Sequence, residues 1–285
     1  MSLGWTLYLL VTALGASALG GMLGMAGGIL VVPILTASGI DIRTAIAASI
    51  VSVIASSCAS AGPYLRRGFT NVRLALVLEL ATTLGAVSGV MLTGLVPTRF
   101  LYALFAVILL VSARQMTALR GSSLEAPAEP DPRGWGTVLG LHSTHRESPS
   151  GEATPYVVRR LPIAMTLMYG AGLVSALLGI GSGVLKIPAM DTALRLPLKV
   201  SSGTSSFMIG VTAAASAGAY FVRGDIVPAV AGPVALGSVV GALAGARVLF
   251  AVSPKRLRTF FVVVLVLLSV QMLLASFGLR IGAKA

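Results

Sequence analysis

One glycine-rich stretch organises the sequence: Leu23-Gly24-Met25-Ala26-Gly27-Gly28-Ile29-Leu30-Val31-Val32-Pro33-Ile34-Leu35. It recurs 155 residues later as Leu178-Gly179-Ile180-Gly181-Ser182-Gly183-Val184-Leu185-Lys186-Ile187-Pro188-Ala189-Met190, and five of the thirteen aligned positions are identical. Each copy lies between apolar runs and contains glycines and a proline, which disfavour a continuous helix. Two such interrupted segments, one in each half of a chain, are typical of the binding site of a secondary transporter.

The composition predicts that the chain lies in a lipid bilayer. Of its 285 residues, 56% are hydrophobic and 11% are charged, and the mean hydropathy is +0.93. A soluble domain has about 25% charged residues. The apolar runs are long and lack the alternating pattern of a barrel strand, which predicts an all-α polytopic membrane protein. The net charge is +12, but Lys and Arg lie mostly at the ends of apolar runs, where they contact lipid head groups. We therefore expect no nucleic-acid partner.

Ten apolar segments can be delimited, five in each half of the chain. They cover residues 3–19, 29–38, 44–65, 73–95 and 99–119, then 161–179, 184–194, 199–222, 227–250 and 257–279. The first two segments of each half are short for two full spans and long for one, so we expect a broken or re-entrant helix there. This gives ten membrane elements, or eight if each broken pair counts once. We assign residues 1–120 to a first transmembrane repeat, 121–158 to a soluble flexible linker and 159–285 to a second repeat.

The duplication extends beyond the glycine-rich stretch. At the same offset Ser49 aligns with Thr204, and at an offset of 156 Gly85 and Gly89 align with Gly241 and Gly245. The basic residues, however, gather in loops that are not equivalent. In the first half they are Arg66, Arg67 and Arg73, and in the second half they are Lys255, Arg256 and Arg258. The positive-inside rule then predicts two inverted-topology repeats, with the linker in the cytoplasm.

The paired glycine motifs are the first candidate for a substrate site. A helix broken there would leave backbone N–H groups and a helix N-terminus free in the membrane, and both favour an anion. The alternative is that the glycines only permit close helix packing. We interpret Pro33 and Pro188, five residues after Gly28 and Gly183, as helix-breaking residues. The predicted substrate-binding residues of the motifs are Ala26, Gly27, Gly28, Gly181, Ser182 and Gly183.

Polar side chains within the apolar runs supply further candidates. The hydroxyls of Ser49, Thr204 and Ser205 either contact an oxyanion or bond back to a helix carbonyl. Lys186 could neutralise an anion, or it could extend to the membrane interface. Glu79 could carry a coupling proton, pair with an arginine, or lie near the interface.

The remaining motifs of the sequence do not indicate a substrate site. Gly85-x-x-x-Gly89 and Gly241-x-x-x-Gly245 are small-residue faces that let two spans, or two protomers of a homodimer, approach closely. His142 and His145 form a weak metal-binding pattern in the linker. There is no nucleophile–base pair and no nucleotide-binding loop in the sequence. We therefore expect neither an enzyme nor a cofactor nor a bound metal.

These motifs resemble the TauE/SafE sulfite exporter family, also called the toluene sulfonate uptake permease family. Its hallmark is a duplicated glycine-rich segment that leads to Val/Ile-Pro, followed by a polar turn and an Ala/Ser-rich helix. The matching residues here are Leu23–Leu35 with Ala45–Ser49 and Leu178–Met190 with Val200–Thr204. The resemblance implies a multi-pass carrier of the bacterial inner membrane for sulfur-containing anions. The chain differs from the family pattern at Ala26 and Ser182, where a glycine is usual, and at Lys186, where an apolar residue is usual.

The combined expectation is a secondary transporter of a small sulfur oxyanion or organosulfonate, which works by alternating access and is coupled to a proton or another ion. The alternative is an anion channel of the same architecture. The second motif has Ser182 and Lys186 where the first has Gly27 and Val31. Substrate choice is therefore expected to reside in the second motif.

Overall fold

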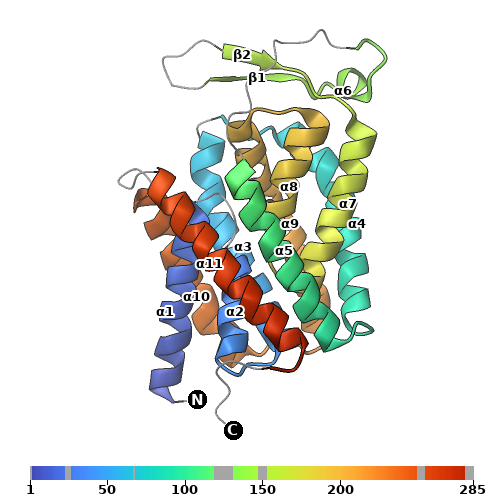
Figure 1. The fold of residues 1–285 in the computed structure, drawn as a ribbon. Coiled ribbons are helices and arrows are strands. Elements are labelled where there is room, and N and C mark those ends of the chain that lie inside the picture. The colour runs from blue at the N-terminus through green and yellow to red at the C-terminus, as the bar shows by residue number, and fades with distance from the viewer. Residues whose placement is uncertain are drawn as a thin grey trace.

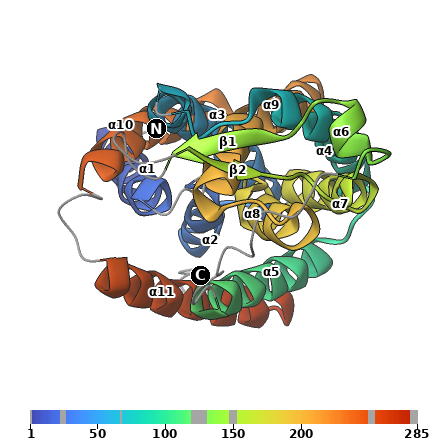
Figure 2. The same cartoon turned by 90° about the horizontal axis from the view of Figure 1, so that it is seen from above.

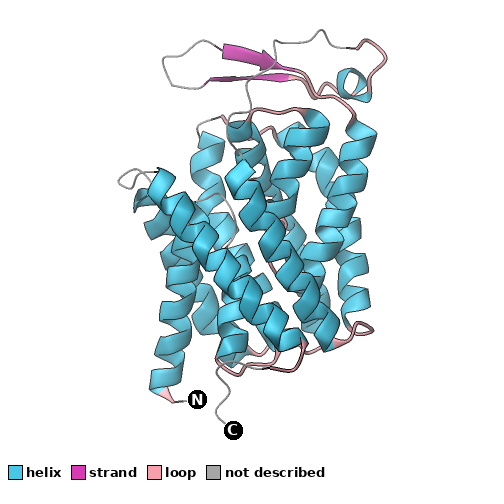
Figure 3. Cartoon of the chain, in the orientation of Figure 1, coloured by secondary structure: helices cyan, strands magenta, loops and turns pink. Residues whose placement is uncertain are grey.

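The computed structural model describes residues 2–22, 27–66, 68–118, 131–146, 153–248 and 254–279, so Ala26 and Arg67 lie outside the described residues. Within them the chain is an all-α bundle with one small hairpin (Figure 3). The first half contains α1 (Leu3–Met22), α2 (Gly28–Ala37), α3 (Ile42–Arg66), α4 (Val72–Thr93) and α5 (Thr98–Ala118). The second half contains α7 (Leu161–Leu178), α8 (Gly183–Ala189), the π-helix η1 (Met190–Leu194), α9 (Leu198–Val222), α10 (Pro228–Val248) and α11 (Pro254–Ser276).

The helices have the length and polarity of membrane spans. Seven helices of the described part are long and apolar enough to cross a bilayer, namely α1, α3, α4, α5, α7, α9 and α10. Gly28–Ala37 and Val262–Ser276 are shorter apolar segments. Large apolar side chains on the outer faces, such as Leu76, Leu80 and Leu84 of α4, are exposed, as expected for contact with lipid. The chain is therefore a multi-pass, all-α membrane protein.

The predicted break at the second glycine motif is present, and residues 23–26 of the first motif lie outside the described residues. Helix α1 ends at Met22 and α2 begins at Gly28, while α7 ends at Leu178 and α8 begins at Gly183. In the second break Gly179 and Gly181 have φ values of +65° and +70°, a conformation that glycine adopts at little cost. The backbone therefore turns here because glycine permits it.

The prolines were wrongly predicted to break the helices. Pro33 and Pro188 lie inside α2 and α8, and after Pro188 the chain continues into η1. A proline within a helix removes one N–H donor, and π-helical turns can absorb such a local irregularity. The hydroxyls of Thr36 and Thr192 donate to the carbonyl oxygens of Pro33 and Pro188, at 2.9 and 2.7 Å.

One helix of each half packs on a helix of the other half, and glycines line both contacts. Helix α4 packs on α7, and α10 packs on α1. A Cβ atom at Gly85 or Gly89 would collide with the carbonyl oxygen of Tyr169 or Leu173. The equivalent contacts on the other side join Gly241 with Leu14 and Gly245 with Ala18. The predicted small-residue faces thus pack helices within one chain.

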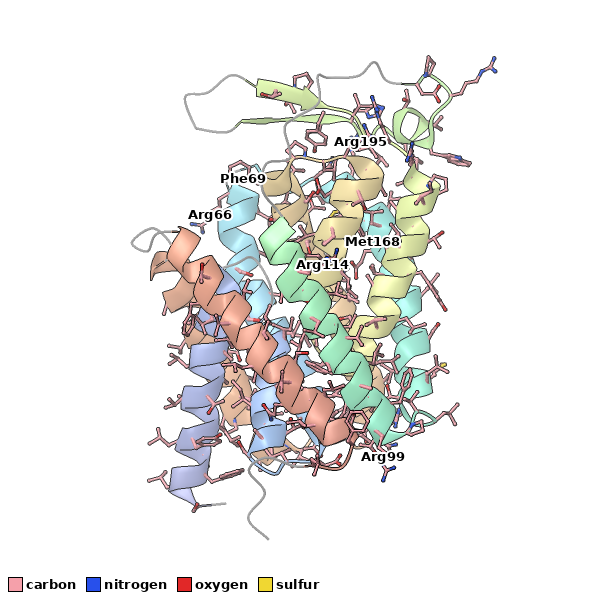
Figure 4. The ribbon with its side chains drawn as sticks, in the orientation of Figure 1. Arg66, Phe69, Arg99, Arg114, Met168 and Arg195 are labelled. Carbon is pink, nitrogen blue, oxygen red and sulfur yellow. The ribbon has the colours of Figure 1, made fainter. Side chains whose placement is uncertain are left out.

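The chain directions can be followed from the linker end of the bundle. Helix α7 begins at the linker end, whereas α1 begins at the opposite end (Figure 1). Arg66, at the end of α3, and Arg195, just before α9, both lie toward the linker, and Arg99 lies at the far end (Figure 4). Helices α3 and α9 therefore run in opposite directions. Seen from above, α2 and α8 lie in the middle of the bundle, with α5 and α11 along one side (Figure 2).

Part of the predicted flexible linker is folded. It contains α6 (Trp135–Val138) and an antiparallel hairpin of β1 (Ser143–Arg146) and β2 (Ala153–Tyr156), which lies across one end of the bundle (Figures 1 and 2). The stretch is ordered because Leu141, Tyr156 and Val158 are buried in a cluster with residues of α4, α7 and η1. The side-chain amide of Asn71, which precedes α4, donates to the Leu141 carbonyl oxygen at 3.0 Å and to the Tyr156 hydroxyl at 2.9 Å. Burial raises the pKa of the Tyr156 phenol.

His142 has a structural role in this stretch. Its Nδ1 accepts from the Val158 N–H at 3.0 Å, and its Nε2 lies 2.9 Å from Thr137 Oγ1. Both ring nitrogens therefore have protein partners. Within the described residues no group of three or more His, Cys, Asp or Glu side chains is placed to hold a metal ion.

Candidate functional site

The two glycine breaks meet inside the bundle. The hydroxyl of Ser49, on α3, is buried and lies 3.2 Å from the carbonyl oxygen of Gly28 and 2.7 Å from that of Gly179. One side chain therefore joins the start of α2 to the end of α7. A Cβ atom at Gly28 would lie 2.8 Å from the same Gly179 oxygen, so glycine is needed for this approach. Ser49 thus holds the two breaks together.

Corresponding contacts hold α2 against α3 and α8 against α9. A Cβ atom at Gly28 would meet Val53 and Ser49, and one at Gly183 would meet Ile209 and, 3.6 Å away, the hydroxyl of Ser205. By contact, the equivalent of Ser49 is therefore Ser205.

The alignment of Ser49 with Thr204 was wrong by one residue. Thr204 Oγ1 instead accepts from the backbone N–H of Asn71 at 3.1 Å, in the loop before α4. The offset between the two halves therefore changes from 155 to 156 before Ser49 in the first half and Ser205 in the second. Thr204 contributes to loop packing, whereas Ser205 lies beside the second break.

Two predicted hydroxyls at the second break have no protein partner. Ser182 and Ser205 are buried, and the described residues offer neither hydroxyl a hydrogen bond. In the first break Ser17, which sequence reasoning missed, lies against Gly27 and is likewise buried and unpaired. Buried polar groups are normally satisfied, and an unpaired one calls for an explanation. A bound ligand at the breaks would supply the missing partner.

Lys186 is fully buried and belongs to a polar cluster. Its Nζ lies 3.3 Å from Glu79 Oε2 on α4 and donates to Thr212 Oγ1 on α9 at 2.6 Å. Thr212 Oγ1 lies 2.5 Å from the other carboxylate oxygen, Glu79 Oε1, which also accepts from Thr83 at 3.2 Å. Of the alternatives weighed for Glu79, pairing with a cation is the observed one, and the cation is Lys186 rather than an arginine. We call these three residues, Lys186, Glu79 and Thr212, the lysine cluster.

The position of Lys186 in α8 directs its charge toward the break. Its backbone N–H donates to the Ser182 carbonyl oxygen at 2.8 Å, so it lies in the first turn of the helix. Side chains of a helix lean toward its N-terminus. The partner Thr212 lies one turn beyond Ile209 on α9, and Ile209 is the residue that faces Gly183. The ammonium therefore lies close to the second break rather than at the membrane interface.

Thr212 was missed because a single threonine in an apolar helix most often bonds to its own backbone. A signal was present in the sequence. Ser205, Ile209 and Thr212 are spaced i, i+4 and i+7, so they share one face of α9. Because Ser205 was already a candidate, the other residues on its helix face, including Thr212, could have been predicted to lie near the site.

Comparison with known proteins agrees with this architecture. The sequence profile of the sulfite exporter TauE/SafE family matches residues 9–272. The chain belongs to the TauE/SafE sulfite exporter family. A probable membrane transporter protein of Bacillus subtilis (strain 168), YunE, is 22% identical over 273 residues, which cover 93% of this chain and 96% of that protein. No solved structure matches the chain. The protein is thus a membrane transporter of this family, with its two breaks and the lysine cluster inside the bundle.

Proposed function

We propose that the protein is a secondary transporter of small sulfur-containing anions of the sulfite, sulfonate, sulfoacetate or thiosulfate class, in the bacterial inner membrane. The observation that carries the proposal is the set of buried polar groups on the helices around the second break, a lysine and two hydroxyls without a protein partner among the described residues. These groups are Lys186, Ser182 and Ser205. A sulfur oxyanion carries negative charge on oxygens that accept several hydrogen bonds. A cation and O–H donors fixed in a site of low dielectric constant would recognise it.

The backbone at the breaks supports the same site. A Cβ atom at Gly27 would collide with the unpaired Ser17 hydroxyl, and one at Gly183 would lie 3.6 Å from the unpaired Ser205 hydroxyl, so glycine keeps both hydroxyls uncovered. Backbone N–H groups at a helix start favour an anion, and α2 begins at Gly28. Ser49 already bonds to two carbonyl oxygens. Its role in this site is to hold the breaks together.

We further propose that the two halves are inverted repeats that expose the site alternately to the two sides of the membrane. The exchanged packing supports this, because α1 lies on α10 as α7 lies on α4, with equivalent glycines at both contacts. The opposite directions of α3 and α9 also support it. Rocking of one half against the other around a central site is the usual mechanism of such transporters. The clustering of Arg66 and Arg195 at the linker end favours a cytoplasmic linker.

A binding screen and a flux assay test this function. A ligand that binds only the folded state raises apparent stability, so we expect a thermal shift with at least one of sulfite, thiosulfate, sulfoacetate, taurine and methanesulfonate. In proteoliposomes the same anion should show saturable flux. Lys186→Ala and Gly183→Leu should abolish this flux while the protein still inserts. Unchanged flux in both variants would refute the site, and unitary currents would identify an anion channel instead.

A further inference from the structure

The charge balance of the lysine cluster limits what can bind to it. Lys186 and Glu79 are 0% and 7% exposed, and their charges cancel across 3.3 Å. A monovalent anion that reached Lys186 would leave one excess negative charge in the buried site. An unpaired buried charge costs several kcal/mol or is removed by a change of protonation. Anion binding at Lys186 therefore favours the uptake of one proton by the site.

Glu79 is the group placed to take this proton. Helix α4 packs on α7 and α9, and α8 packs on both of these helices. No Asp, Glu, Lys or Arg occurs in α7, and its one tyrosine, Tyr169, bonds to Ser88. On α9 the charged residue is Lys199, thirteen positions before Thr212. In the described part of the chain, Lys186 is the charged group that faces Glu79, and Thr83 and Thr212 are the hydroxyls that do so.

The equivalent place in the other half has none of these polar partners. Val31 occupies the position of Lys186, Ala235 that of Glu79 and Ser56 that of Thr212. Ser56 donates to the Val53 carbonyl oxygen of its own helix at 3.2 Å. The corresponding helices thus pack together without an ion pair. The ion pair is therefore not required for this packing, which favours a role in transport.

We propose that Glu79 carries the coupling proton of the transporter and that the anion and the proton cross the membrane together. When the Glu79 carboxylate is protonated, the resulting carboxylic acid releases Lys186, and the ammonium binds the anion. On the other side the carboxyl group loses its proton, and the carboxylate pairs with Lys186 again and displaces the anion. The expected stoichiometry is about one proton per monovalent anion. The inference rests on the proposed function, because it assigns the coupling ion of the same site.

Proton movement in proteoliposomes tests the inference. Methanesulfonate is a suitable probe for the stoichiometry, because it is a monovalent anion that gains no proton between about pH 6 and pH 8. In the wild type, an inward pH gradient should drive accumulation of the anion, and a trapped pH indicator should record proton entry. In Glu79→Gln the gradient-driven accumulation should fall roughly tenfold or more, while anion exchange persists at a rate that no longer varies with pH. Asp225→Asn is the matched control, since Asp225 pairs with Arg223 outside the cluster, and it should keep proton-driven accumulation.

The outcomes separate this inference from the proposed function. Wild-type anion flux without proton entry would overturn the inference and leave the transport function standing, and so would proton-driven accumulation in Glu79→Gln. Absence of anion binding and flux in the wild type would overturn both. The wild-type stoichiometry needs no variant, so it decides the question even if Glu79→Gln fails to fold. Glu79→Asp, which keeps a titrating group, should retain proton-driven accumulation.

Discussion

The helices that follow the two glycine breaks pack in the same way but carry different chemistry. In both, a glycine packs against a serine and a branched side chain of the next long helix, Ser49 and Val53 in the first half and Ser205 and Ile209 in the second. The first break is followed by an uncharged helix, whereas the second is followed by buried Lys186 with its partner Glu79. Glycine at the start of each following helix therefore accounts for its close packing on the next long helix. The polar residues of the second break account for the function that we assign to it.

Of the variants that compare the two breaks, one that removes a single charge of the lysine cluster should lose the most stability. Lys186→Val, which copies the first break, leaves Glu79 buried without its cation. We expect a loss of about 3–5 kcal/mol in the free energy of unfolding. Chemical unfolding in detergent micelles measures it.

The double variant Lys186→Val/Glu79→Ala copies both residues of the first half. It should recover most of the stability lost in the single variant, because no unpaired buried charge remains. A double variant less stable than the single one would show that the ion pair holds α4 and α8 together, contrary to our account.

Substituting a glycine at the α4–α7 contact and at the α10–α1 contact should cost the same stability. A methyl group at Gly85 or at Gly241 would collide with a backbone carbonyl oxygen, that of Tyr169 or that of Leu14. Gly85→Ala and Gly241→Ala should each destabilise the protein by about 1–3 kcal/mol, since backbone must move. Gly170→Ala and Gly232→Ala, where a Cβ atom meets nothing within 4 Å, are the controls and should stabilise by up to about 1 kcal/mol. A large cost at Gly85 with none at Gly241 would contradict the equivalence of the halves.

Substituting the glycines at the starts of α2 and α8 should cost different amounts of stability, but the difference should be smaller than the effects above. A Cβ atom at Gly28 would lie 2.8 Å from a backbone oxygen, whereas one at Gly183 would meet the tip of Ile209 at 2.6 Å. A side-chain tip can move more easily than backbone. Gly28→Ala should therefore cost about 1 kcal/mol more than Gly183→Ala in thermal unfolding. Equal costs would mean that the first break is as adaptable as the second.

The unpaired hydroxyls should have the smallest effect on stability and a clear effect on binding. Ser182→Ala and Ser205→Ala remove groups without a protein partner, so stability should change by less than about 0.5 kcal/mol. Loss of one hydrogen bond to the anion should weaken binding by roughly tenfold. Ser49→Ala is the contrast, because its hydroxyl bonds to two carbonyl oxygens, and it should lose stability. Unchanged anion affinity in both Ser182→Ala and Ser205→Ala would remove these hydroxyls from the site.

The sequence predicts the membrane elements well because hydrophobicity and glycine act locally. The span expected at 44–65 is α3, Ile42–Arg66, and the expected break at the second motif lies between Leu178 and Gly183. The effect of Pro33 was misjudged because the helix around it is buried and packed on its neighbours, and this packing overrides the local preference. The order in the linker was missed for a similar reason, since Leu141 and Tyr156 find their apolar partners on distant helices.

The candidate site was only partly predictable. Lys186 and Glu79 stand out as charges within apolar runs, but they are 107 residues apart, and only the exchanged packing of the two halves brings them together. The equivalence of Ser49 and Ser205 depends on a one-residue shift that similar apolar sequences do not fix. A membrane span is determined by the local sequence, whereas a contact between distant side chains forms only when the helices pack together.

The most direct test of the account is anion uptake by the wild type and by Lys186→Val/Glu79→Ala. Both proteins are reconstituted in proteoliposomes at equal amounts, and uptake of labelled thiosulfate and methanesulfonate is followed over a range of concentrations. We predict saturable uptake by the wild type and uptake at the level of empty vesicles by the double variant, although the double variant is folded. Equal uptake by the two proteins would contradict the assignment of substrate binding to the second break.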